Sequence, residues 1–408
     1  MRILLVNKFI FPKVGAETYT FDVGKMLEEH GHEVQYFGLE NEKNIVGNRV
    51  GSYVTNMDFS QGIKANLNAP FRIIYSREAR KKIRAVLDDF QPDVVHLNNI
   101  QYHLTPSIIL EINKWRKETK KECKIVYTTH DYQLVCPSHG MFDVNMKPCE
   151  RCLDGHYIHC FQTKCLKNSR AKSLLGTLDG YMWKYSKAYS YVDAYICCSF
   201  FLKSKLDTQK RFRDKTIGLH NFKKEMPHLD NIQKKGYVLE FGHLSRDKGT
   251  DTLLEVAKKM PNTEFAFIGY GPSADKMKDI PNVKYLGFKT GEELYRIIAE
   301  AAISVCPSEQ YENCPYSVIE SVLLGTPVVG SKMGGIPELI EPGKTGELFE
   351  AGNVEDLMKA IKKVLQTQDV LERYTKNCSQ AKYETTESYY IKLMKIYRGE
   401  KNVEQISS

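Results

Sequence analysis

Short apolar runs alternate with amphipathic stretches along the chain. An apolar run at residues 2–7 is followed by a loop, a helical stretch that ends at Gly31, and a second apolar run at residues 33–39. Strand, helix and strand within about forty residues form a βαβ unit, which implies a parallel sheet. Three more buried strands, each followed by polar residues, are predicted at residues 92–99, 124–131 and 194–199.

A second series begins after residues 216–236, which show little periodicity and which we interpret as a linker. Strands are predicted at residues 237–242, 263–269, 283–288, 303–308, 326–331 and 346–350. Helices are predicted at residues 250–260, 292–301, 318–325 and 354–366. The repeated alternation predicts an α/β protein with two doubly wound parallel-sheet domains, residues 1–218 and 219–383, and a terminal helix at about residues 384–400.

The most informative stretch is residues 308–338, which contains two glutamates eight positions apart, Glu312 and Glu320. Asn313 is a good N-cap and Pro315 is tolerated in a first helical turn, so a helix is predicted to begin near Asn313. Backbone N–H groups at a helix start attract an anion. Two carboxylates beside such a start suit a ligand with hydroxyls at both ends and phosphate between them, which is the shape of a nucleotide-sugar.

Other strand ends of the second half also suit a phosphate. Gly242 ends a strand, and the loop after it carries Arg246 and Lys248, which can neutralise a diphosphate. Glycine turns follow two further strands, Gly269 with Gly271 and Gly334 with Gly335. Together they predict a phosphate-bearing nucleotide ligand held mainly by the second domain.

The strand ends of the first half carry a glycine loop and several polar side chains. The loop at residues 9–17 follows the first strand, where doubly wound sheets bind ligands, and its Gly15 is either a close-approach position or a plain turn glycine. His96, His130 and Ser199 lie at later strand ends. Asp131 beside His130 can fix the tautomer of an imidazole. Structural and catalytic interpretations of these histidines both remain open.

Charge and hydropathy indicate the kind of ligand or surface that the protein binds and its cellular location. The 408 residues carry a net charge of +8, which favours an anionic ligand or surface. Residues 64–84 hold seven basic residues against Glu78, either a solvated helix face or a surface for an anionic membrane. No apolar run reaches the roughly 18 residues of a transmembrane helix, and the N-terminal run does not resemble a signal peptide. We therefore expect a cytoplasmic protein, peripheral at the inner face of the membrane, with mostly reduced cysteines.

A cysteine-rich insertion interrupts the first domain at residues 136–165. Cys149 and Cys152 form a C-x2-C pair, and Cys160 and Cys165 follow, so four thiolates are available for a structural zinc. Cys136 makes the ligand set ambiguous. Packed thiols without metal, or a redox pair, are the alternatives.

Motifs along nearly the whole chain resemble the retaining glycosyltransferases of family 4. The most specific are residues 312–320 (ENCPYSVIE), 325–340 (GTPVVGSKMGGIPELI) and 343–349 (GKTGELF). Weaker matches, in family order, are Gly15-Ala16-Glu17, residues 31–34, 92–96, 129–131 and 220–221, Lys248-Gly249 and residues 268–272. The resemblance implies the GT-B fold, in which two Rossmann-like domains face each other across a cleft and the last helix crosses back to the first domain. It also implies sugar transfer from a nucleotide-sugar, with retention and without a catalytic metal or other cofactor.

The resemblance also assigns roles to residues. Glu312 would bind hydroxyls of the donor sugar, Glu320 the ribose hydroxyls, and Lys248 the diphosphate. Gly15 would give the donor room, and His130 would lie against the transferred sugar. The remaining donor-binding positions are Gly269, Gly271, Asn313, Cys314, Pro315, Tyr316 and Ser317.

Two positions depart from the family pattern. His243 stands where the family has an arginine that helps to bind the diphosphate, so either His243 or Arg246 is expected to replace it. The first loop reads Gly15-Ala16 where many members have two glycines.

We therefore hypothesise a hexosyltransferase that moves a sugar from a UDP- or GDP-sugar to a glycan or lipid-linked acceptor, in the biosynthesis of a surface polysaccharide. One alternative is a GT-B sugar-nucleotide epimerase. Another is a non-enzymatic, zinc-stabilised binder of an anionic ligand or nucleic acid, which would leave Glu312 and Glu320 without a role. With the transferase as the leading hypothesis, no nucleic-acid partner is expected.

Overall fold

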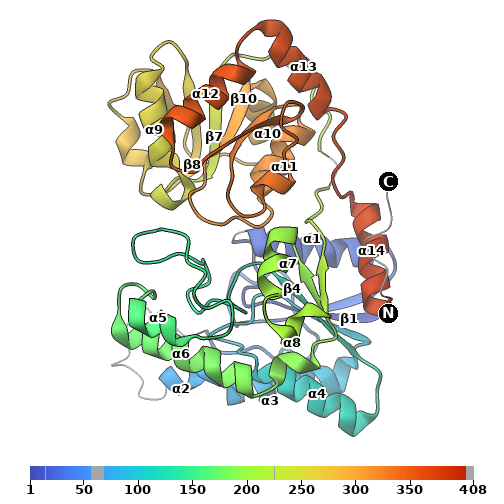
Figure 1. The fold of residues 1–408 in the computed structure, drawn as a ribbon. Coiled ribbons are helices and arrows are strands. Elements are labelled where there is room, and N and C mark those ends of the chain that lie inside the picture. Colours follow the sequence, from blue (N-terminus) through green and yellow to red (C-terminus); the bar gives the residue numbers. More distant parts are fainter. Residues whose placement is uncertain (14, 57–68, 225, 401–408) are drawn as a thin grey trace. The chain divides into compact units, whose positions relative to one another are not determined.

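The computed structural model describes residues 1–13, 15–56, 69–224 and 226–400 (Figure 1). The chain divides into two compact units, each built around one parallel sheet. The first unit comprises Met1–Val144, Cys149–Asn221 and the segment from Thr386 onward, and the second comprises Asn145–Pro148 and Phe222–Thr385. The predicted α/β class with two doubly wound sheets is confirmed.

The sheet of the first unit has six parallel strands in the order β2-β1-β3-β4-β5-β6. Its register places Leu5 of β1 opposite both Tyr36 of β2 and His96 of β3. The strands are β1 (Arg2–Val6), β2 (Glu33–Phe37), β3 (Val94–Leu97), β4 (Lys124–Thr129), β5 (Ala194–Cys197) and β6 (Thr216–Gly218). The central strands are buried over nearly their whole length, because helices cover a parallel sheet on both faces.

Helices connect these strands as crossovers. They are α1 (Gly15–Glu29), α2 (Ala69–Ile74), α3 (Arg77–Phe90), α4 (Ser107–Thr119), α5 (Ile158–Thr163), α6 (Arg170–Tyr185), η3 (Ala188–Tyr191), α7 (Phe200–Leu206) and α8 (Lys210–Arg213). Ser76 shows why α3 begins where it does, since its side chain accepts a hydrogen bond from the Ala79 N–H as an N-cap.

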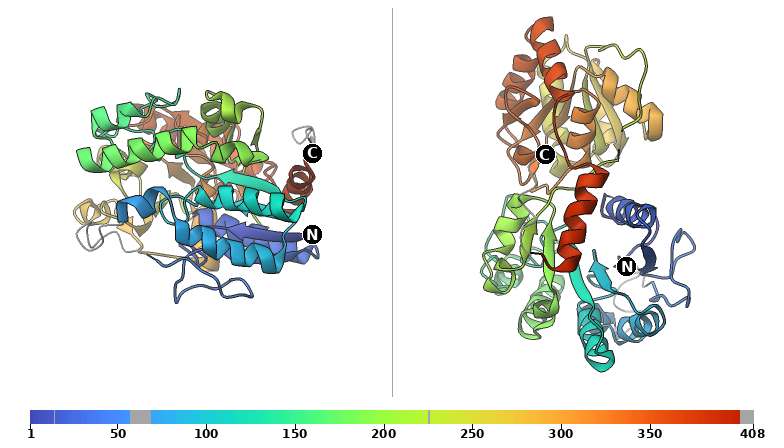
Figure 2. Two further views of the ribbon diagram at one scale, coloured as in Figure 1. Left: turned by 90° about the horizontal axis from the view of Figure 1, so that it is seen from below. Right: turned by 90° about the vertical axis from the view of Figure 1, so that its right-hand side faces the viewer.

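The last helix, α14 (Thr386–Arg398), belongs to the first unit and lies beside α1 (Figures 1 and 2). Two buried hydrogen bonds hold it there. The Tyr19 and Tyr389 hydroxyls are 2.7 Å apart, and the Tyr397 hydroxyl is 2.7 Å from His96 Nδ1. The first unit is therefore completed by residues from the far end of the chain.

The sheet of the second unit also has six parallel strands, in the order β12-β11-β10-β7-β8-β9. The strand order reverses between β7 and β10, which is the point where such sheets bind nucleotides. The strands are β7 (Val238–His243), β8 (Phe265–Tyr270), β9 (Val283–Tyr285), β10 (Ile303–Cys306), β11 (Val328–Ser331) and β12 (Gly346–Phe349). The helices are η4 (Arg246–Lys248), α9 (Thr250–Lys259), η5 (Ala274–Met277), α10 (Gly291–Glu300), α11 (Tyr316–Leu323), η6 (Ile336–Glu338), α12 (Val354–Val364) and α13 (Gln368–Cys378).

The structure corrects one sequence-based expectation and adds an observation to another. The predicted linker at residues 216–236 begins with a strand, β6, which is too short at three residues to show a period. The basic segment at residues 64–84, of which Lys64 lies outside the described residues, has more acidic partners than its own sequence suggested. Arg80 pairs with Glu111 at 2.6 Å and Arg84 with Glu118 at 2.5 Å, both carboxylates coming from α4. Among the described residues, no helix is both long and apolar enough to span a bilayer.

Candidate active site

The candidate donor site lies in the second unit, where β10 leads into α11. The prediction that a helix begins near Asn313 was wrong, because α11 begins at Tyr316 with Pro315 as its N-cap. A residue before proline is pushed out of the helical region, so Cys314 cannot be helical and Asn313 cannot be the cap. No side chain caps the first turn, and the start of a helix attracts an anion.

Glu312, in the loop before α11, pairs with Lys248 from the turn after β7. The Lys248 Nζ to Glu312 Oε1 distance is 2.5 Å, and the side chains are only 30% and 17% exposed. Ser308 Oγ donates to the same carboxylate oxygen at 2.9 Å. Burial lowers the pKa of Lys248, but the Glu312 carboxylate outweighs this and leaves the pKa above its ordinary value. Lys248 therefore stays protonated beside the Glu312 carboxylate.

A glycine positions this carboxylate. Gly334, in the turn after β11, has φ +62°, and a Cβ there would stand 2.0 Å from the carbonyl oxygen of Glu312. The next N–H, of Gly335, donates to that carbonyl at 2.7 Å. The Gly334-Gly335 turn therefore fixes the position of the Glu312 backbone, and only glycine fits at residue 334.

The pair lies on the wall of a cavity of about 260 Å³ at the carboxyl ends of β7 and β10. His243 lines it, and Arg246 does not. Of the two candidates to replace the family arginine, His243 thus has the better position. The other lining residues are Glu240, Phe241, Gly242, Lys248, Val305, Cys306, Pro307, Ser308, Glu312, Pro315, Ser317 and Glu320.

Glu320 lies on the cavity side of α11, one turn after Tyr316. Its Oε1 is 2.6 Å from Lys223 Nζ, and both side chains are 13% exposed. Lys223 Nζ also stands 5.3 Å from the centre of the Tyr316 ring, within reach of a cation–π contact. Glu320 is therefore a buried, neutralised carboxylate.

Glu240 of β7 is a third carboxylate on the cavity wall. It is 4% exposed, and Thr250 Oγ1 donates to its Oε1 at 2.7 Å. Its Oε2 is buried without a hydrogen-bond partner. Burial raises the pKa of Glu240 to about 8, because the charged form is desolvated. Glu240 therefore carries a proton at neutral pH.

The strand ends of the first unit form a separate polar cluster. Asn7, just after β1, donates from Nδ2 to Glu17 Oε1 at 3.1 Å and accepts the Asn99 N–H at 3.0 Å. Glu17 is in the first turn of α1, which Gly15 begins. Asn98, after β3, is 2.9 Å from His130 Nε2, after β4.

His130 is buried in this cluster. Burial lowers its pKa to about 4, an effect that the neighbouring Asp131 only partly offsets, so the imidazole is neutral at pH 7. The Tyr19 ring contacts it edge-on at 4.9 Å. Asp131 is directed instead to His139, at 3.3 Å from its Nδ1. The hypothesis that Asp131 fixes the His130 tautomer is therefore wrong. The side chain that is hydrogen-bonded to the His130 ring, at Nε2, is Asn98.

The predicted site residues fall into groups. Glu312, Lys248, His243, Pro315, Ser317 and Glu320 share one cavity. Gly269 and Gly271 do not line it. Both have a positive φ, +134° and +154°. A Cβ at Gly269 would stand only 1.8 Å from the Gly242 oxygen of β7, so these glycines serve the packing of the strands. Cys314 is buried, and Asn313 and Tyr316 are partly buried in the same loop and first turn.

Two polar residues of the cavity wall, and the lysine that pairs with Glu320, were missed from sequence. Ser308 and Glu240 lie within predicted strands, where their polar side chains give no signal of which way they point. Lys223 lies in the stretch taken for a linker and is 97 positions from its partner Glu320. As the side chains stand, no three His, Cys, Asp or Glu side chains in the described part of the chain are arranged to hold a metal ion.

Solved structures with the same fold cover nearly the whole chain. Sucrose-phosphate synthase of Thermosynechococcus elongatus superposes with a TM-score of 0.69 over 97% of this chain and 98% of that one, at 17% identity. HepE of Anabaena, solved with UDP-glucose, gives a TM-score of 0.61 over 93% and 94% of the two chains, also at 17% identity. Identities this low show the fold alone. Two Rossmann-like sheets with these neighbours define a GT-B fold.

Sequence comparison gives the family. Residues 14–221 match Glycosyltransferase Family 4, and residues 221–381 match Glycosyl transferases group 1. The chain belongs to this glycosyltransferase family and is a glycosyltransferase enzyme.

Individual relatives match over different shares of their length. Sulfoquinovosyl transferase SQD2 of Arabidopsis thaliana is 34% identical over 38% of this chain, which covers only 31% of the relative. An uncharacterized 42.6 kDa protein in the cps region of Klebsiella pneumoniae is 24% identical over 83% of this chain and 87% of its own. The amylovoran biosynthesis glycosyltransferase AmsK of Erwinia amylovora is 29% identical over 37% of this chain and 41% of the relative.

Proposed function

We propose that this glycosyltransferase takes a sugar from a UDP- or GDP-sugar and transfers it, with retention, to a glycan or lipid-linked acceptor of a surface polysaccharide. The observation that carries the proposal is the Lys248–Glu312 pair on the cavity at the β7–β10 reversal. It puts a cation, a carboxylate and the uncapped first turn of α11 around one space. A nucleoside-diphosphate sugar offers a matching anion and hydroxyl groups.

The pair is arranged to exchange partners when the donor binds. In the free chain Lys248 neutralises Glu312. With donor present, the diphosphate would take the ammonium, and Glu312, still held by Ser308, would accept hydroxyls of the sugar. Glu320 would accept the ribose hydroxyls. Both carboxylates are acceptors only while ionised, and hydroxyl recognition uses them in that form.

The reaction would break the bond between the sugar C1 and the diphosphate oxygen. Negative charge then develops on the leaving diphosphate, and Lys248, His243 and the α11 N–H groups would stabilise it. In a front-side mechanism the acceptor oxygen bonds to C1 on the same face, and its proton passes to the leaving phosphate oxygen.

The test combines donor binding with turnover. Thermal unfolding is followed with UDP-, GDP- and ADP-sugars, because a ligand of the folded state raises its apparent stability. We expect a shift with UDP- or GDP-sugar, and release of free UDP or GDP when a membrane extract is added. Glu312→Ala should lower turnover by at least 100-fold while the protein still folds, although it unfolds at a lower temperature because Lys248 loses its partner. The exposed Glu350→Ala should behave as wild type. Full turnover by Glu312→Ala would overturn the assignment of the site.

We also propose that the enzyme binds an anionic membrane, through α6 and not through the basic segment at residues 64–84 considered from sequence. This helix exposes Leu174, Leu178, Met182 and Tyr185, by 43%, 51%, 37% and 71%. Their spacing of four, four and three residues puts them on one face of the helix. Exposed cations flank the stripe at both ends, namely Lys167, Arg170, Lys172 and Lys187. An apolar stripe flanked by cations suits a bilayer with acidic headgroups.

Vesicle sedimentation tests this surface. Binding to phosphatidylglycerol vesicles is expected to exceed binding to phosphatidylcholine vesicles. Leu174→Ser with Leu178→Ser should lower it at least fivefold. Ile391→Ser, a matched change at a 42% exposed residue of α14, should leave it unchanged. Equal binding by the stripe variant and wild type would refute the proposed surface without touching the donor site.

A further inference from the structure

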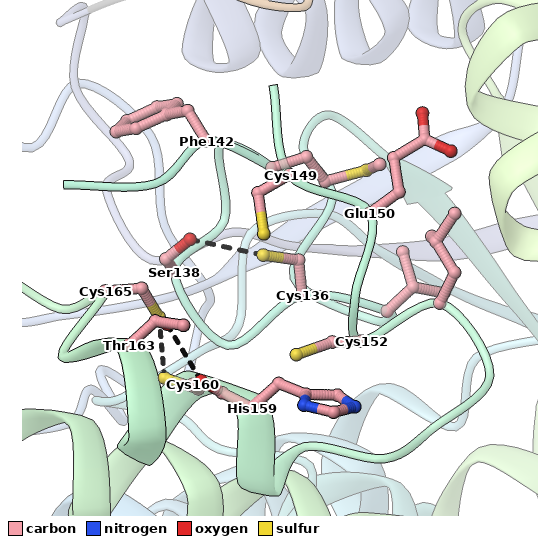
Figure 3. A pocket seen from close by; sticks show the side chains of 13 residues that line it. Cys136, Ser138, Phe142, Cys149, Glu150, Cys152, His159, Cys160, Thr163 and Cys165 are labelled. Atoms are coloured by element: carbon pink, nitrogen blue, oxygen red, sulfur yellow. Dashed lines mark hydrogen bonds between the residues drawn. The ribbon is translucent and has the colours of Figure 1, made fainter. Parts of the chain in front are cut away.

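Five of the eleven cysteines line one small cavity in the first unit (Figure 3). They are Cys136, Cys149, Cys152, Cys160 and Cys165. All five are free thiols, and the cavity of about 10 Å³ has room for one occupant of the size of a water molecule or an ion. The sugar-transfer site uses none of them.

Two of the five cysteines have sulfurs close enough either to form a disulfide or to share a metal ion. Cys160 and Cys165 Sγ are 2.8 Å apart. A disulfide bond is about 2.05 Å long, whereas two thiolates on one zinc, each about 2.3 Å from it, stand about 3.8 Å apart. The observed 2.8 Å lies between the disulfide length and the zinc-bound separation, so this pair alone favours neither. The choice between a disulfide and a metal site therefore depends on the other three thiols.

The surroundings of the thiols favour a metal. Between the end of β4 and the start of α5 the chain forms no helix or strand. Its own core consists of Cys152, Tyr157 and Cys160, with Cys165 and two other partly buried side chains packed on it. A segment without regular secondary structure gains stability from a cross-link, because the cross-link removes conformational freedom from the unfolded chain. A disulfide would use two thiols and leave three against the same cavity.

We infer that Cys149, Cys152, Cys160 and Cys165 bind one Zn²⁺ ion as a structural, four-thiolate site. The C-x2-C pair comes from the loop before α5, and the C-x4-C pair comes from α5 (Cys160) and the residues just after it (Cys165). Binding releases four thiol protons to solvent and replaces the waters of the ion with four Zn–S bonds. The four side chains are not yet arranged around an ion. Binding therefore requires them to reorient, and the Cys160 and Cys165 sulfurs, now 2.8 Å apart, must separate by about 1 Å. Cys136, whose Sγ is 3.2 Å from Ser138 Oγ, remains a fifth, unligated thiol.

Metal analysis of the full chain tests this inference. Protein purified without chelator should contain about one zinc per chain. Serine at any of the four ligands should lower that content at least fivefold, whereas Cys136→Ser should keep it. The matched control is Cys123→Ser, a buried free cysteine outside the cluster. Cobalt exchanged into the wild-type site should give the intense thiolate-to-metal absorption of a tetrahedral site.

A second measurement needs no variant, in case the serine variants do not fold. Titration of the wild-type protein with an organomercurial should release one zinc as four thiols react. Less than half an equivalent of zinc overturns the inference, and so does a Cys160–Cys165 disulfide found by mass spectrometry. Zinc retained by a ligand variant also overturns it. None of these results depends on glycosyl transfer.

Discussion

Replacing Lys223 by methionine tests whether the Glu320 carboxylate is as buried as the structure shows. The variant removes the ammonium 2.6 Å from Glu320 and leaves that carboxylate 13% exposed without its cation. Removing one partner of a buried ion pair costs about 3–5 kcal/mol. Because Glu320 also lines a cavity, where water can reach its carboxylate, we expect a cost at or below the bottom of this range, about 2–3 kcal/mol.

The assay is thermal unfolding of the full chain, with the transition of the second unit assigned by its shift with donor nucleotide. In a domain of this size 1 kcal/mol moves the midpoint by about 2–4 °C, so the variant should unfold about 4–12 °C lower. Lys332→Met is the matched control, because Lys332 and Glu350 are equally close at 2.6 Å but 49% and 62% exposed. Exposed pairs are worth at most about 1 kcal/mol, so this variant should move by less than about 4 °C.

A double variant separates the buried charge from lost packing. Lys223→Met with Glu320→Gln removes the unpaired carboxylate, so at least half of the lost stability should return. If Lys223→Met unfolds no lower than Lys332→Met, or if the double variant is no better than the single one, then Glu320 is not the desolvated group described above.

Three further variants follow from the site. Gly334→Ala should reduce turnover at least tenfold, because its Cβ would meet the Glu312 oxygen at 2.0 Å, whereas Gly343→Ala, with φ +80° but open space, should cost stability without loss of turnover. Burial gives Glu240 a pKa of about 8 in the folded state against an ordinary 4.5, so the folded state binds more protons between these values. The free energy of unfolding therefore falls as pH rises from 4.5 to 8, and melting curves of Glu240→Gln should lack this fall. His130 has a folded pKa of about 4 against 6.5, so stability falls as pH drops from 6.5 to 4, and the drop should be smaller in His130→Gln; an equal slope in both proteins would contradict a neutral His130.

Much of the fold could be predicted from the sequence because its strands are short, apolar and separated by amphipathic helices. The parallel order of each sheet follows from that alternation. β6 was missed because three residues cannot show a period. The start of α11 was misplaced because the capping preference of Asn313 was given more weight than the restriction that Pro315 puts on the residue before it.

The candidate site could be predicted as a set of residue types, and its pairings could not. The spacing of Glu312 and Glu320 indicated a ligand with hydroxyls and phosphate, but both lysines that neutralise them come from distant positions. The basic segment shows the converse case, since Glu111 and Glu118, which pair with Arg80 and Arg84, lie on another helix. Side-chain partners across a fold depend on tertiary packing, which one sequence does not display.

The position of α14 sets the order in which the units can finish folding during synthesis. The chain leaves the first unit at Asn221 and supplies its last helix only from Thr386. At about 5–20 residues per second, the ribosome needs roughly 9–35 s to make the residues from 222 to 398. During that time Tyr19 and His96 lack the tyrosines that they bond in the finished protein. The second unit is complete in sequence first, so the N-terminal unit of the chain is the last to close.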